Sequence, residues 1–136
     1  MTRRLLLLPL LLLCACQAYR TQPYDPVDSV AYSALGHDPF WLLTIGDDRM
    51  ILTLGDEGGR ADGALDSYSW PRALPRIADG LRTWEAAGET AAITVQARPG
   101  PCEGSGGRLY EDHVRVGLSG RELVGCGGRT IERPDD

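Results

Sequence analysis

Two segments with alternating apolar residues flank the dipeptide Asp47-Asp48, and they constrain the fold more than any other part of the chain. Residues 39–46 and 49–54 have the side-chain period of two that is typical of β-strands, and short acidic residues suit a turn between them. A two-residue loop places one set of apolar side chains on a single face, in the cross-strand pairs Ile45–Met50, Leu43–Leu52 and Trp41–Leu54. The face that carries Trp41 is therefore expected to be core, and the opposite face, with Leu42 and Ile51, is mixed.

Three further segments, residues 89–96, 114–118 and 122–125, also have strand-like composition. The last two predict a second hairpin around Ser119-Gly120. Its register stays open, because a two-residue turn and a bulged turn shift the pairing by one residue. These segments predict an all-β, mainly antiparallel domain over residues 30–130, either a small β-barrel or a curled sheet.

The middle of the chain, residues 75–88, fits two structures. Ile77, Leu81 and Trp84 have helical spacing, with proline before them and glycine after them. Gly80, however, would cost about 1 kcal/mol inside a helix, and residues 81–86 also fit a short strand after an Asp-Gly turn. Because the surrounding segments are β, we favour the strand.

The N-terminus has the pattern of a secretory signal. Arg3 and Arg4 precede an apolar run over residues 5–13, which is too short for a bilayer span of about twenty residues. The following residues, Leu13-Cys14-Ala15-Cys16, resemble the lipobox of bacterial lipoproteins. The resemblance predicts a signal peptide over residues 1–15 and attachment of lipid, including palmitate, to Cys16.

The residues after Cys16 bear on localisation. Gln17 is not the Asp that commonly retains lipoproteins in the inner membrane, so the resemblance favours the outer membrane with the domain in the periplasm. Residues 16–29, which contain Pro23 and Pro26 and few apolar residues, are expected to form a flexible tether. Residues 131–136 are expected to be a free C-terminal end.

The cysteine count predicts one disulfide. Cys14 leaves with the signal and Cys16 carries lipid, so Cys102 and Cys126 remain to pair in an oxidising compartment. A metal site or redox pair is disfavoured, because there is no C-x-x-C motif and neither histidine has metal-like spacing to a cysteine. We therefore expect no metal and no cofactor.

The charge and the scarcity of catalytic groups limit the function. The formal charge is −5, and loss of Arg3 and Arg4 with the signal takes it to −7, which argues against nucleic acid as a partner. His37 and His113 are the only two imidazoles, and no G-x-S-x-G motif surrounds a serine. The adjacent acidic pairs point to opposite faces of a strand or lie in turns. We expect a protein that is not an enzyme.

Five side chains are candidates for contacts with a ligand or partner: His37, Asp38, Trp70, Tyr110 and His113. His37 is expected in a turn with a hydrogen bond to the backbone, and His113 on a strand facing solvent. The tryptophans are expected mainly in the core. Trp70, which a proline follows in a loop-like segment, is expected to be the most exposed of them.

Two parts of the chain resemble a family of uncharacterised bacterial envelope lipoproteins. The family's G-x-E-P-F-W segment resembles Gly36-His37-Asp38-Pro39-Phe40-Trp41. Its later C-x-D-G-M-S-D…Y-P…G-C-A segment is similar to the frame formed by Cys102, Tyr110, residues 114–118 and Gly125-Cys126-Gly127. The resemblance covers about residues 30–128 and supports the β structure of the middle segment and the cysteine pairing.

The chain also departs from that family pattern. Asp38 replaces the usual Glu, and residues 103–107 replace an acidic, Met-containing loop. If that loop binds a ligand in the family, this chain has lost or altered the function. The resemblance implies no activity.

These features favour a non-catalytic binding or envelope-maintenance module, anchored to the membrane by lipid, with an envelope protein or a cell-wall-related ligand as partner. One alternative is an inhibitor of lysozyme-like cell-wall hydrolases, because small lipid-anchored β-barrels with one disulfide include such inhibitors. A hydrolase of the cell wall is a further alternative, which the scarcity of candidate bases disfavours. A structural role, with the Leu42/Ile51 face packed on a partner, is the last.

Overall fold

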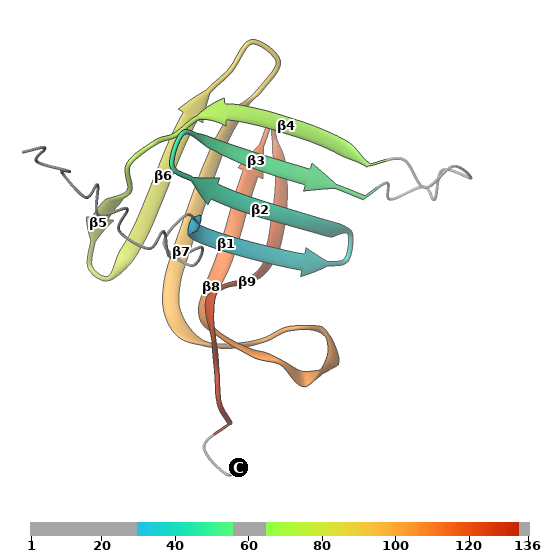
Figure 1. Ribbon diagram of the computed structural model, residues 1–136, viewed down its shortest axis with the longest axis vertical. Helices are drawn as coiled ribbons and strands as arrows, with labels where there is room; N and C mark the ends of the chain where they lie inside the picture. The colour runs from blue at the N-terminus through green and yellow to red at the C-terminus, as the bar shows by residue number, and fades with distance from the viewer. Residues whose placement is uncertain (1–29, 56–64, 134–136) are drawn as a thin grey trace, which may run out of the picture.

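A computed structural model describes residues 30–55 and 65–133 of the chain (Figure 1). These residues form a nine-stranded antiparallel sheet in the order β4-β3-β2-β1-β9-β8-β7-β6-β5. The strands are β1 (Val30–His37), β2 (Phe40–Gly46), β3 (Arg49–Leu54), β4 (Asp66–Pro71), β5 (Arg76–Ala78), β6 (Leu81–Ala87), β7 (Ala92–Glu103), β8 (Leu109–Leu118) and β9 (Arg121–Ile131). The predicted signal peptide, Cys16 and the predicted tether lie outside the described residues.

The sheet curls into a half-barrel, which confirms the all-β expectation and its curled-sheet form. Strands β1–β4 run across the inner face of β6–β9 (Figure 1). One hydrophobic cluster fills the space between the two halves, and it includes Trp41, Trp70 and Trp84. Both halves therefore bury the residues of one alternation and expose the residues of the other.

The first hairpin has the predicted register. Ile45 pairs with Met50, Leu43 with Leu52 and Trp41 with Leu54. All six side chains are buried, and the opposite face is mixed, as expected, with Leu42 exposed and Ile51 half-buried. A turn of two short acidic residues and the period of two were sufficient to fix this part of the fold.

Two more hairpins have two-residue turns. In the middle segment, Asp79 (φ 51°) and Gly80 (φ 76°) connect β5 to β6, so the strand is confirmed over the helix. Ser119 (φ 48°) and Gly120 (φ 83°) connect β8 to β9, where Leu118 pairs with Arg121. Positive φ at both central residues matches the twist of the flanking strands, and it settles the register that the sequence left open.

Three strands were not expected, and several expected ones are longer. The sequence pattern predicts no strand at β1, β4 or β5, whereas β7 continues to Glu103 and β8 begins at Leu109. The free C-terminal end was expected from residue 131, but β9 includes Ile131, and the Arg133 guanidinium donates a hydrogen bond of 2.9 Å to the Gly107 carbonyl. These last described residues therefore belong to the fold.

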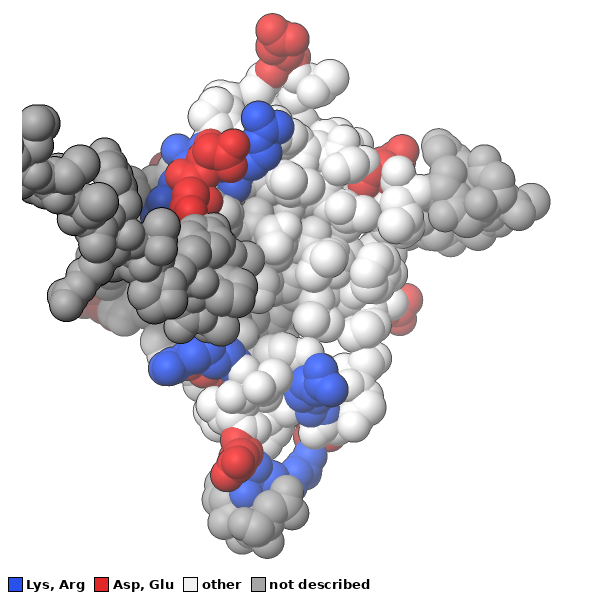
Figure 2. Space-filling view, viewed as in Figure 1, with Lys and Arg blue, Asp and Glu red and all other residues white. Residues whose placement is uncertain are grey.

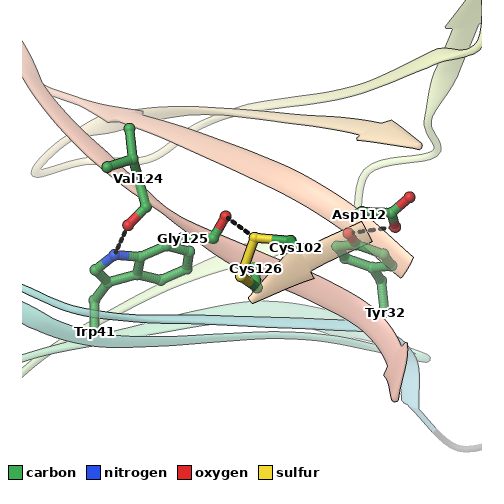
Figure 3. The surroundings of a disulfide bond; sticks show 7 residues. All are labelled: Tyr32, Trp41, Cys102, Asp112, Val124, Gly125 and Cys126. Carbon is green, nitrogen blue, oxygen red and sulfur yellow. Dashed lines mark hydrogen bonds between the residues drawn. A yellow bond between two sulfur atoms is a disulfide. The ribbon is translucent and has the colours of Figure 1, made fainter. Parts of the chain in front are cut away.

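The two halves of the sheet meet at a short seam between β1 and β9. Only two residue pairs join these strands in the described chain, Ala34–Gly127 and Leu35–Cys126. Beside them, the Trp41 indole donates a hydrogen bond of 3.2 Å to the Val124 carbonyl (Figure 3). A Cβ on Gly125 would lie 2.7 Å from Trp41 Cζ2, so the indole occupies space that only glycine leaves.

The predicted disulfide is present beside this seam. Cys102, near the end of β7, pairs with Cys126 of β9 at a Cα–Cα distance of 5.5 Å (Figure 3). The bond therefore connects the irregular end of β7 to the strand that joins the two halves.

Candidate functional site

A charged cluster is buried at the inner face, and it serves the fold. Asp112 of β8 is 2% exposed and is the buried charged residue of the described core. Its Oδ2 accepts a hydrogen bond of 2.8 Å from the Tyr32 hydroxyl and another from the Arg82 guanidinium. Three strands that are distant in sequence, β1, β6 and β8, are joined by one carboxylate oxygen.

Aromatic packing completes this cluster. The Tyr32 and Trp84 rings stack with centroids 4.9 Å apart, and the Arg82 guanidinium lies 4.9 Å from the Tyr32 centroid. Burial raises the pKa of the Tyr32 hydroxyl, and its hydrogen bond to Asp112 acts in the same direction. The phenol therefore stays protonated and donating. Because the buried charge is paired and hydrogen-bonded, we assign this cluster a structural role.

The groove that we take as the candidate site lies on the opposite, outer face of β6–β9. It has a volume of about 510 Å³ and is lined by Leu81, Gln96, Arg98, His113, Val114, Arg115, Val124 and Gly125. That volume is within the range of small-molecule sites, roughly 300–1,000 Å³. We call it the outer groove.

Strand register brings the polar side chains of the outer groove together. On β7, residues 93, 95 and 97 are buried, so Gln96 and Arg98 point outward. On β8, Val114 and Val116 are buried, so His113 and Arg115 point outward. Arg98 pairs directly with His113 and Gln96 with Arg115, which makes a block of four polar side chains on two adjacent strands.

The groove carries positive charge that is only partly compensated. Arg115 Nη1 lies 3.5 Å from Glu122 Oε1, and both side chains are more than 60% exposed, so their pairing is weak. Arg98 has no ion-pair partner within residues 30–55 and 65–133. The His113 ring lies near Gly100 of the neighbouring strand, where a Cβ would be 3.4 Å from His113 Cδ2. The groove thus presents hydrogen-bond donors to solvent.

The structure separates the five candidate residues. His113 is exposed on β8 opposite Cys126, as predicted, and lines the outer groove. His37 and Asp38 line a smaller recess of about 260 Å³, which adjoins the outer groove at Val124 and Gly125 but does not include the block of four. Tyr110 is half-buried and pairs with Cys102 on β7.

Two expectations about these residues are wrong or unsupported. Trp70 was expected to be the most exposed tryptophan, but it is 2% exposed on β4, and its indole donates a hydrogen bond of 2.8 Å to the Ala91 carbonyl. Its alternation with Tyr68 on β4 directs both rings inward. His37 is the last residue of β1, and among the described contacts its ring lies 6.2 Å from Phe40 with no hydrogen bond to the backbone.

Of the four polar residues in the block, the sequence identified only His113. Arg98, Arg115 and Gln96 could be placed on the outward face of strands by alternation alone. Their adjacency depends on the β7–β8 register, which passes through a bulge between Pro99 and Cys102. That irregularity is what the sequence pattern did not reveal.

The outer face of β1–β4 is a second exposed surface, and it is nearly free of charge (Figure 2). Its residues are the outward members of the ladders: Ser33, Leu35, Leu42, Thr44, Ile51, Thr53, Ser67 and Ser69. Charged residues appear at its margins in this view (Figure 2). It offers no polar cluster comparable to the outer groove.

The part of the chain that the structure describes also bears on metal binding and on membrane insertion. No group of three or more His, Cys, Asp or Glu side chains there could hold a metal ion. No described segment is a helix of sufficient length and hydropathy to cross a bilayer.

The fold and the outer groove together define a small β-sheet domain, braced by a disulfide, with a cationic groove on its outer face. Comparison of the chain with known proteins finds no matching family model, no similar curated protein and no similar solved structure.

Proposed function

We propose that the protein is a non-catalytic binding module of the bacterial envelope, tethered by lipid on Cys16, and that the outer groove is its ligand site. The groove is the observation that carries the proposal, because its volume of about 510 Å³ and its lining suit a small ligand or an extended segment of a larger one. The lining supplies hydrogen-bond donors with aliphatic surface beside them. A lining of this kind can bind a ligand that has both polar and apolar groups.

The rigid surroundings support a binding role. The groove lies on the ladders β6–β7, β7–β8 and β8–β9, each of which continues over six or more residue pairs. The opposite face of the same strands is packed in the core, where Val95 and Val116 are fully buried. The backbone positions of the groove residues are therefore fixed before a ligand arrives, which lowers the entropic cost of binding.

The ligand site is tested by thermal shift of the purified protein against peptidoglycan fragments, phospholipid headgroups and oligosaccharides. The variant Gln96→Trp introduces a bulky side chain at a residue that lines the groove. The matched variant Thr44→Trp adds the same ring to the outer face of β2, away from the groove. We expect at least one ligand class to stabilise the natural chain and Thr44→Trp but not Gln96→Trp. If no ligand class stabilises the natural chain, or if each ligand class stabilises all three proteins equally, the proposal is contradicted.

The anchor rests on the sequence pattern Leu13-Cys14-Ala15-Cys16 and needs its own test. Cells that express the protein are labelled with palmitate. We expect label in the natural chain and in Cys14→Ala, and none in Cys16→Ala, because cleavage of residues 1–15 removes Cys14, and Cys102 and Cys126 are paired in the disulfide. Fractionation is expected to place the labelled protein in the outer membrane. Label that persists in Cys16→Ala contradicts the anchor and leaves the groove proposal standing.

A further inference from the structure

We propose that the ligand of the outer groove carries an oxyanion, a carboxylate or a phosphate group, on a short aliphatic body. This inference rests on the proposed function and names the class of ligand. It follows from the block of four polar side chains, Gln96, Arg98, His113 and Arg115, and from the two aliphatic residues beside it.

The arrangement of donors fits one oxyanion. Side chains directly opposite on antiparallel strands have Cβ atoms about 5 Å apart, and diagonal ones are about 7–8 Å apart. Arg98 and Arg115 are the diagonal members of the block, so their long side chains can converge on a group held between them. Each guanidinium presents a planar fork of N–H donors that matches carboxylate or phosphate oxygens.

The other two members add neutral donors. The Gln96 amide has two N–H bonds, and the His113 imidazole retains a ring N–H in either protonation state. Both side chains line the same groove as the arginines. No carboxylate lines the groove among the described residues, so the block offers many more donors than acceptors.

The charge of the groove is opposite to that of the whole chain. The chain has a formal charge of −5, yet the groove contains two arginines, of which Arg98 has no ionic partner in the described ranges. Arg115 forms an ion pair with the exposed Glu122, and an exposed ion pair of this kind contributes little stability. An incoming anion can therefore take the place of Glu122 at small cost.

The aliphatic surface limits the rest of the ligand. Leu81 lies on β6 at the Arg98 side of the block, and Val124 lies on β9 as the direct partner of Arg115. Val124 is 58% exposed, so it has apolar surface to lose to a ligand. An anion with a short apolar body can contact either residue while its charged end stays between the arginines.

The test is a titration of the purified full chain followed by backbone amide NMR, with hexanoate and hexanamide as probes. The two compounds have the same shape and differ in charge. We expect hexanoate to shift amides of residues 81–83, 96–98, 113–115 and 124, with hexanamide at least about tenfold weaker, because charged hydrogen bonds are the stronger ones. Hexyl phosphate and inorganic phosphate are titrated in parallel. Tighter binding of hexyl phosphate than of hexanoate identifies phosphate as the preferred oxyanion, and the reverse identifies carboxylate.

Charge variants locate the contact. Arg98→Gln and Arg115→Gln are each expected to weaken hexanoate binding about fivefold, which corresponds to about 1 kcal/mol for an exposed charged contact. Arg49→Gln, on β3 in the other half of the sheet, removes the same charge and is expected to leave the affinity unchanged. Glu122→Gln is expected to tighten binding about twofold, because it releases Arg115. Glu132→Gln is the control for that change.

Each failure has a separate meaning. If hexanamide binds in the groove as tightly as hexanoate, the oxyanion inference is wrong while the groove remains a ligand site. If hexanoate shifts amides elsewhere and Arg98→Gln binds it as the natural chain does, the inference is also overturned. The proposed function fails independently, when Gln96→Trp responds to every ligand class as the natural chain does.

Discussion

The Tyr32 hydroxyl donates a hydrogen bond of 2.8 Å to the Asp112 carboxylate, across 80 positions of sequence. This bond connects β1, in one half of the sheet, with β8 in the other. It lies on one side of the disulfide, and the Trp41–Val124 hydrogen bond lies on the other (Figure 3). The junction of the two halves is therefore held by polar contacts as well as by the core.

The first prediction concerns this hydrogen bond. Tyr32→Phe is expected to lower the free energy of unfolding by about 1.5–3 kcal/mol, the usual contribution of a hydrogen bond to a charged group. Tyr68→Phe, which removes a hydroxyl from a half-buried ring on β4, is expected to change it by less than about 0.5 kcal/mol. Urea denaturation measures both. Equal losses in the two variants would show that the bond to Asp112 has no special weight.

The second prediction is a dependence of stability on alkaline pH. The pKa of Tyr32 is raised in the folded protein, chiefly by burial. The unfolded chain therefore loses this proton first, and its contribution to stability is present below about pH 10 and declines above it. We expect the natural chain to lose more stability than Tyr32→Phe between about pH 8 and about pH 10.5. Parallel curves for the two proteins would contradict the assignment.

The third prediction concerns the close approach at the seam. In Gly125→Ala, the added methyl group would lie 2.0 Å from the Leu35 carbonyl oxygen. We expect a loss of about 3 kcal/mol, because the backbone cannot move without breaking the β1–β9 pairs and the Trp41 indole cannot move without breaking its hydrogen bond to the Val124 carbonyl. Gly117→Ala is the matched control on β8, since its methyl group meets no atom closer than 3.9 Å. Thermal or urea unfolding that ranks the two variants equally would refute the packing argument.

The fourth prediction concerns the disulfide. Replacement of Cys102 and Cys126 by serine removes a loop closure of 24 residues, and the expected loss is about 3.5 kcal/mol in the chain-entropy model. A reductant is expected to lower the unfolding midpoint of the natural chain and to leave the double variant unchanged. A midpoint that does not respond to reductant in the natural chain would show that the bond adds no stability.

The sequence predicted the parts of the fold that depend on local pattern. The β2–β3 hairpin followed from a short turn and from alternation, and the disulfide from the number of cysteines left after processing. β1 was missed because its inward positions are Tyr32, Ala34 and Gly36, of which two are small, while Leu35 points outward. Glycine is needed at position 36 because a Cβ there would overlap the Trp41 ring of the next strand.

The tertiary relationships were beyond the sequence. Trp70 was assigned to a loop because Pro71 follows it, yet β4 is an edge strand, where proline is tolerated. The alternation of Tyr68 and Trp70 with serines was the signal that would have shown this strand. Arg98 and Arg115 were missed for a different reason, because only the register between β7 and β8 makes them neighbours.

The position of the disulfide has a consequence for the order of folding. Both cysteines belong to the half that contains β7–β9, so the covalent loop can close before β1 docks. The β1–β9 pairs join residues that are more than 90 positions apart, and contacts of such separation require the largest loss of chain entropy. Oxidation can therefore precede completion of the sheet, and the C-terminal hairpins become a preformed template on which the N-terminal strands assemble.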